Sequence, residues 1–156
     1  MESLIYLAPV VGVIALIFAL FLSKKVSREE EGTDRMKEIA AAISDGAHAF
    51  LTAEYKILVI FIIVLFILIS LGIGFKSGVA FVLGTLCSIL AGYFGMSVAT
   101  KANVRTANAA RTSGMNRALS TAFSGGAVMG MSVVGLGLLG VSIVYMVTGD
   151  TNVLFG

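Results

Sequence analysis

The acidic side chains that could take part in phosphate or metal chemistry follow one another along residues 33–56. They are Asp34, Glu38, Asp45 and Glu54. Mg²⁺ prefers oxygen ligands, usually including carboxylates, so these residues are the candidates for such a site. On a helix Asp34 and Glu38 are neighbours, but Asp45 lies about 16 Å further along at roughly 1.5 Å per residue. These carboxylates therefore form no compact site without help from other segments.

The other reactive side chains stand alone in the sequence. His48 is the single histidine and has no second histidine, cysteine or spaced carboxylate to complete a metal site. Cys87 is the single cysteine and lies among apolar neighbours, where a thiol behaves as a small hydrophobe. The glutamates of residues 29–31 are interpreted as a solvated charge run, and the glycine pair 125–126 has no lysine to make a phosphate loop. We accordingly assign no catalytic, cofactor-binding or metal-binding residue to this chain.

Most of the sequence consists of long apolar runs, and the segments between them carry most of the charged residues. Hydrophobic residues make up 58% of the chain and charged residues 13%, against about 25% charged residues in ordinary globular domains. About 20 apolar residues cross the ~30 Å hydrocarbon layer as a helix, and the runs lack the alternation of barrel strands. The sequence therefore predicts an all-α membrane protein, part of a larger helical bundle. Its four transmembrane helices are expected at residues 1–22, 57–75, 77–100 and 118–149.

The first run is predicted to be a retained anchor. A signal peptide carries basic residues before its apolar stretch, whereas here only Glu2 precedes the run and Lys24 and Lys25 follow it. The pattern of small residues that a signal peptidase requires is also missing.

Basic residues are distributed unevenly among the connections. Residues 23–56 hold six of them and residues 101–117 hold four, whereas Lys76 stands alone in a turn expected at Phe75–Gly78. Because basic residues stay on the cytoplasmic side, both of the richer segments are expected in the cytoplasm. A multi-pass protein of the plasma membrane then results, with both ends of this chain, including residues 150–156, outside.

The first connection is expected to contain an amphipathic helix. Thr33 or Asp34 can cap it, since an oxygen of either side chain accepts from an exposed backbone N–H. Its apolar face comprises Met36, Ile39, Ala40, Ile43, Ala47, Phe50 and Leu51, at three- and four-residue spacing. The helix runs into the second apolar run through Tyr55, which suits the level of the lipid headgroups. An interfacial or docking role is predicted.

Small residues distinguish the third and fourth runs from the bulky second run. They recur at four-residue spacing as Ala80, Gly84, Ser88 and Gly92, as Ala91, Gly95 and Ala99, and as Ala122, Gly126 and Gly130. A helix face without large side chains lets another helix approach closely, so tight packing is predicted there. A substrate groove is the alternative. The bulky second run is expected to face lipid.

Three stretches resemble a known family. GTDRMKEIAAAISDGAHAFLTAE at residues 32–54 resembles the first cytoplasmic segment of membrane-bound, ion-pumping inorganic pyrophosphatases. GVAFVLGTLCSILAGYFGMSVATKANVRTANAAR at residues 78–111 resembles the third helix of that family with its cytoplasmic extension, residues 101–117 here. SGGAVMGMSVVGLGLLG resembles the fourth helix. The resemblance covers nearly the whole chain in the order of the family, beginning at the family's amino terminus.

The resemblance implies an enzyme that hydrolyses pyrophosphate with Mg²⁺ and couples this reaction to the transport of H⁺ or Na⁺. It further implies a homodimer whose chains form an inner ring of helices surrounded by outer helices. This chain would supply four outer-ring helices, and the residues that hold Mg²⁺ and pyrophosphate would lie in later helices. Its partners would be those remaining helices, a second copy and the lipid bilayer, and the fragment alone is expected to be inactive.

Two other classes of protein are considered beside this one. A four-span proteolipid subunit of a rotary ATPase shares the length and glycine content, but it needs a carboxylate inside the membrane, and the apolar runs here hold none. A non-enzymatic membrane scaffold fits the composition, and only the resemblance argues against it. Nucleic-acid binding is not expected, because the basic residues lie between apolar runs and not in one patch.

Overall fold

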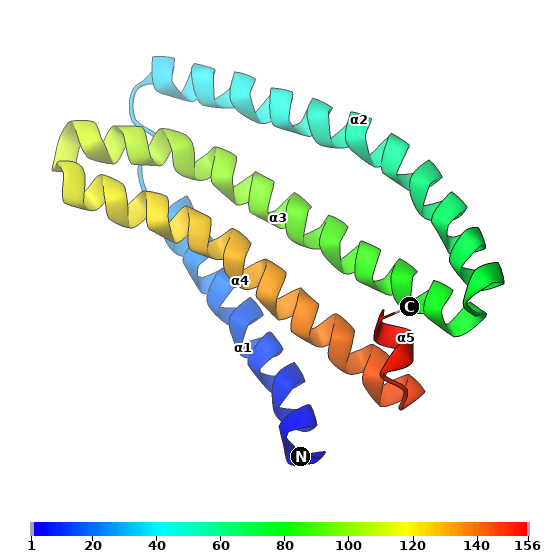
Figure 1. The fold of residues 1–156 in the computed structure, drawn as a ribbon. Helices are drawn as coiled ribbons and strands as arrows, with labels where there is room; N and C mark the ends of the chain where they lie inside the picture. The colour runs from blue at the N-terminus through cyan, green and yellow to red at the C-terminus, as the bar shows by residue number, and fades with distance from the viewer. Residues whose placement is uncertain (1, 156) are drawn as a thin grey trace.

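The computed structural model describes residues 2–155, and helices account for nearly all of them (Figure 1). The elements are α1 (Glu2–Ser27), α2 (Asp34–Gly72), α3 (Phe75–Ser113), α4 (Met115–Thr148) and the short α5 (Asn152–Phe155). Helices α1 to α4 are each long and apolar enough to cross a membrane. The predicted class, an all-α membrane protein with four spanning helices, is confirmed.

The four long helices lie side by side in the order α2, α3, α4, α1 (Figure 1). Helix α4 packs against both α3 and α1, whereas α2 touches α3 alone among the described elements. The link between α1 and α2 lies at the same end of the molecule as the α3–α4 turn at Gly114. We call this the Gly114 end, and the opposite end, with the α2–α3 turn and α5, the Gly74 end.

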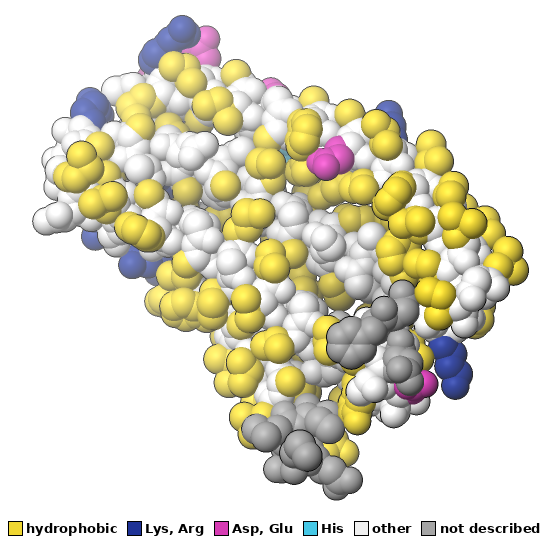
Figure 2. Space-filling model, in the orientation of Figure 1, with side chains coloured by type: hydrophobic (Ala, Val, Ile, Leu, Met, Phe, Trp, Pro, Cys, Tyr) yellow, Lys and Arg dark blue, Asp and Glu magenta, His cyan; other side chains and the backbone are white. Residues whose placement is uncertain are grey.

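Helix α2 combines the expected amphipathic helix and the second apolar run in one continuous element. Thr33 caps it, and its Oγ1 accepts a hydrogen bond from the Met36 N–H at 3.4 Å. Leu51 is the one buried residue of α2 in the described part of the chain. Side chains such as Ile57 and Leu71 are largely exposed, as expected of a helix that faces lipid. Figure 2 shows hydrophobic side chains over this part of α2, and Lys and Arg side chains at the Gly114 end.

The turn between α2 and α3 lies earlier than expected. The turn predicted at Phe75–Gly78 is wrong, because α3 already begins at Phe75 and the chain reverses at Gly74. Gly74 has a φ of 149°, a conformation that side chains rarely allow, so glycine determines where the helices part. Ser77 and Gly78 are buried, and a Cβ on Gly78 would lie 3.2 Å from the Phe66 ring.

Helix α1 packs on α4 through a face of small residues that the sequence analysis did not single out. Gly12, Ala15 and Ala19 are buried on this face. A Cβ on Gly12 would lie 2.9 Å from the backbone oxygen of Gly135, so the two backbones approach closely at this point. Glycine and other small residues allow the backbones of two membrane helices to approach this closely. The three- and four-residue spacing of Gly12, Ala15 and Ala19 is the sequence signal of this face.

Candidate functional site

The four carboxylates considered first do not converge. Asp34 pairs with Lys37 at 3.1 Å and Glu38 with Arg35 at 2.6 Å, both on the exposed surface of α2. Among the described residues, no group of three or more His, Cys, Asp or Glu side chains could hold a metal ion. Their helix instead docks on α3 through other contacts, in which the His48 ring lies 6.4 Å from the Tyr93 ring, centre to centre.

A polar cluster at the Gly114 end joins the α1–α2 link to α3, and Arg105 is its centre. The Arg105 side chain is only 9% exposed. Its Nη2 donates to Oε1 of Glu31 at 2.8 Å, its Nε to the Glu29 backbone oxygen at 3.1 Å, and its Nη1 to the Lys101 oxygen at 2.9 Å. One buried guanidinium therefore holds two positions of the link and one position of its own helix.

Asn108 stands one helical turn further along α3 and holds the next part of the link. Its Nδ2 donates to the backbone oxygen of Glu30 at 3.2 Å, and its Oδ1 accepts from Arg111 at 3.1 Å. Gly32 has a φ of 89° and lies against the Asn108 amide, where a Cβ would approach Oδ1 to 2.7 Å. The link can therefore pass Asn108 in this conformation only as glycine.

The third contact joins the link to α4. Arg117 donates through Nη2 to Oε1 of Glu29 at 2.7 Å. The interpretation of residues 29–31 as a solvated charge run is therefore wrong for Glu29 and Glu31, which pair with Arg117 and Arg105. The cluster borders a cavity of about 830 Å³ and contains no nucleophile with an adjacent base, so it is suited to holding the link and not to bond chemistry.

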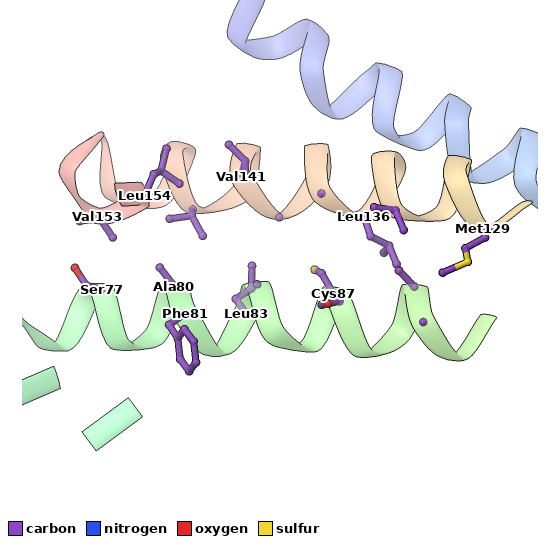
Figure 3. A pocket seen from close by; sticks show the side chains of 18 residues that line it. Ser77, Ala80, Phe81, Leu83, Cys87, Met129, Leu136, Val141, Val153 and Leu154 are labelled. Carbon is purple, nitrogen blue, oxygen red and sulfur yellow. The ribbon is translucent and has the colours of Figure 1, made fainter. Parts of the chain in front are cut away.

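A second hollow, of about 510 Å³, lies between α3 and α4 toward the Gly74 end (Figure 3). Leu83 and Cys87 of α3 face α4 across it, and Val153 and Leu154 of α5 lie at one end. Its lining is mostly apolar and includes Gly84 and Gly92. The Ser77 and Ser88 hydroxyls and the Cys87 thiol also line it, but no histidine or charged side chain does.

The expected tight packing of the small-residue stripes is only partly found. Gly95 and Ala91 are buried, and a Cβ on Gly95 would lie 2.6 Å from the Met129 side chain. A Cβ on Gly84, Gly126 or Gly130 would meet nothing within 4 Å. Among the described residues these two stripes make no close contact: the Gly84 stripe lines the hollow between α3 and α4, and Gly126 and Gly130 are exposed. Close packing of these two stripes in a larger bundle stays a prediction.

The four long apolar helices define a segment of a multi-pass membrane protein. Its described residues form a polar cluster around Arg105 but no group of side chains that could hold a metal ion. Residues 13–154 match the family described as inorganic H⁺ pyrophosphatase, and the chain belongs to this family. The resemblance stated from the sequence is thereby confirmed.

Individual relatives are consistent with this assignment. A K⁺-insensitive pyrophosphate-energized proton pump of Methanosarcina mazei is 46% identical over 100% of this chain and 23% of its own length. A K⁺-stimulated pyrophosphate-energized sodium pump of Thermotoga maritima is 46% identical over 94% of this chain and 20% of its own length. A relative from Clostridium tetani is 56% identical over 84% of this chain and 19% of its own length. The chain spans about a fifth of the length of these relatives.

Proposed function

We propose that this chain is the N-terminal, outer-ring part of a membrane pyrophosphatase that couples pyrophosphate hydrolysis to the pumping of H⁺ or Na⁺. The match of residues 13–154 to the family carries this proposal. Relatives of similar identity are named as a proton pump and as a sodium pump, so the choice of ion is left open. The segment then serves as a scaffold, and Mg²⁺ and pyrophosphate bind to residues elsewhere in a homodimeric enzyme.

The described carboxylates support this division of labour. Magnesium with pyrophosphate needs several oxygen ligands at one place, and the acidic residues of α2 are spread along its surface, two of them paired with neighbouring bases. No step of the reaction is therefore assigned to residues of this chain. The polar cluster around Arg105 contributes by fixing the link between α1 and α2.

An assay of pyrophosphate hydrolysis distinguishes this proposal from the alternative of a non-enzymatic membrane scaffold. Full-length protein, purified in detergent and in sealed vesicles, is expected to release phosphate from pyrophosphate in a magnesium-dependent manner. The 156-residue chain is expected to release no more than empty membranes, because the carboxylates that the structure describes do not converge at one place. Magnesium-dependent hydrolysis by the short chain would show that it holds a catalytic site, and an inactive full-length protein would favour the scaffold.

Orientation is the second testable part of the proposal. We infer a cytoplasmic Gly114 end and an external Gly74 end, because basic residues favour the cytoplasmic side. Single cysteines at Ser27 and Lys76 are suitable probes, because both positions are exposed, whereas the neighbouring Ser77 is buried. A membrane-impermeant maleimide added to intact cells with full-length protein should label Lys76→Cys and spare Ser27→Cys. The reverse pattern would contradict the orientation.

We further propose that the Gly84 and Gly126 stripes contact helices of the remaining chain. Gly84→Leu should then destabilise the full-length protein by about 1–3 kcal/mol, the usual cost of overpacking, and lower its thermal unfolding midpoint. The four helices themselves have room for the new side chain, since nothing lies within 4 Å of the added Cβ. Leu68→Ala, on the exposed side of α2, is the control and should change little. Equal tolerance of both changes would contradict a packed stripe.

A further inference from the structure

A groove with a strong positive charge lies at the Gly114 end, between the end of α1 and the start of α4. Its volume is about 400 Å³, and its lining comprises Phe21, Lys24, Lys25, Arg28, Glu29 and Arg117. We propose that this groove binds the phosphate of an anionic phospholipid, with the acyl chains running along α1. The proposal goes beyond the pump function, because it requires only that α1 spans the membrane.

The charges of the groove leave three cations without a carboxylate. Glu29 is the one acidic residue of the lining, and it is engaged by Arg117 at 2.7 Å. In the part of the chain that the structure describes, Lys24, Lys25 and Arg28 belong to none of the ion pairs. An anionic group that enters the groove therefore meets uncompensated positive charge, and an arginine can bind two phosphate oxygens with its planar fork.

The polarity of the groove matches a lipid better than a soluble anion. Phe21 lies one helical turn before Lys24 and Lys25, and its side chain is 63% exposed. Further toward the middle of α1, Phe18 and Leu20 are also exposed. A phosphate bound at Lys24 or Lys25 thus lies directly above apolar surface, as a headgroup lies above its acyl chains. Free phosphate would gain nothing from this apolar wall.

The groove is more than the usual excess of basic residues at the cytoplasmic end of a spanning helix, because a second helix contributes to it. That excess, and the partial negative charge at the end of a helix, account for Lys24 and Lys25 on α1 alone. Arg117 arrives from α4, and it neutralises Glu29, which would otherwise repel a phosphate. In the neighbouring cavity of about 830 Å³, by contrast, Arg105 is already bound to the link, so that cavity is the weaker candidate.

Lipid retention by the full-length protein tests the proposal. Protein reconstituted with equal parts of phosphatidylglycerol and phosphatidylcholine is released into mild detergent, and the bound lipids are counted by native mass spectrometry. The triple change Lys24→Gln, Lys25→Gln, Arg28→Gln should reduce retained phosphatidylglycerol about tenfold or more, since each basic residue near the surface adds to the attraction. Phosphatidylcholine should be unaffected.

A matched control removes three basic residues outside the groove. Arg35→Gln, Lys37→Gln and Lys56→Gln remove the same charge from α2, and phosphatidylglycerol should be retained as in the unchanged protein. An equal loss in this control, or no loss in the groove variant, would overturn the proposal. The second result would be expected if helices of the remaining chain fill the groove.

A second variant keeps the proposal testable if the triple change does not fold. Glu29→Gln removes the acidic residue of the groove and frees Arg117, so retention of phosphatidylglycerol should rise severalfold. Millimolar inorganic phosphate or pyrophosphate should not displace the lipid. Displacement by either, or unchanged retention in Glu29→Gln, would overturn the assignment to a phospholipid. None of these measurements depends on pyrophosphate hydrolysis, so the pump function can fail independently.

Discussion

Replacing Gly12 by leucine should separate α1 from α4 and destabilise the protein by about 3 kcal/mol or more, the upper part of the range for overpacking. A Cβ at this position would lie 2.9 Å from the backbone oxygen of Gly135 and 3.1 Å from the Leu139 side chain. A backbone oxygen in a helix cannot move aside as the end of a flexible side chain can. Gly135→Leu should have the same effect, because its Cβ would meet the Gly12 oxygen at 2.9 Å.

Thermal unfolding of the full-length protein in detergent measures this loss. Gly46→Leu is a suitable control, because nothing lies within 4 Å of a Cβ added there on α2. The control should leave the melting temperature unchanged or raise it slightly, since leucine favours a helix more than glycine does. A Gly12→Leu protein as stable as this control would show that α1 and α4 do not pack as described.

Replacing Arg105 by alanine should have the second large effect, a loss of about 3 kcal/mol. The change removes hydrogen bonds to Glu31, to the Glu29 backbone oxygen and to the Lys101 oxygen. It also leaves the Glu31 carboxylate, which is half-buried, without its cation. The link between α1 and α2 should then detach from α3, and an added protease should cleave it faster.

The conservative change Arg105→Lys distinguishes geometry from charge at this position. Lysine restores the positive charge but lacks the planar fork that reaches several acceptors at once. Partial rescue of stability, with cleavage of the link still faster than in the unchanged protein, is therefore expected. Arg111→Ala serves as the control, since Arg111 is exposed and donates a hydrogen bond to Asn108. Equal resistance of Arg105→Ala and the control would contradict the central role of Arg105.

The class of the protein and its long helices follow from the sequence because both depend on local properties. Hydrophobicity over about 20 residues selects a spanning helix whatever its neighbours are. Capping and the three- and four-residue spacing of apolar residues predicted the helix that begins after Thr33 and runs through Tyr55 into the second span. The family could likewise be recognised from stretches such as residues 78–111, and the match of residues 13–154 confirms it.

The tertiary structure decided which helix faces of small residues pack against another helix. Four-residue spacing marks Gly84 and Gly126 as it marks Gly95, yet only Gly95 is in close contact within the described chain. Spacing identifies a face that can be approached, but the crossing of two particular helices decides whether it is. Gly12, Ala15 and Ala19 on α1 also have three- and four-residue spacing, but only the tertiary structure shows that α4 packs against this face.

The polar cluster, too, required the tertiary structure. Arg105 and Glu31 are 74 residues apart, and a run of three glutamates reads locally as solvated surface. Their pairing follows only once α3 is placed beside the end of α1, where burial makes an unpaired guanidinium costly and thereby selects its partner. The sequence alone thus determined what each segment is, through local hydrophobicity, capping and charge. Long-range packing decided which of these segments and side chains meet.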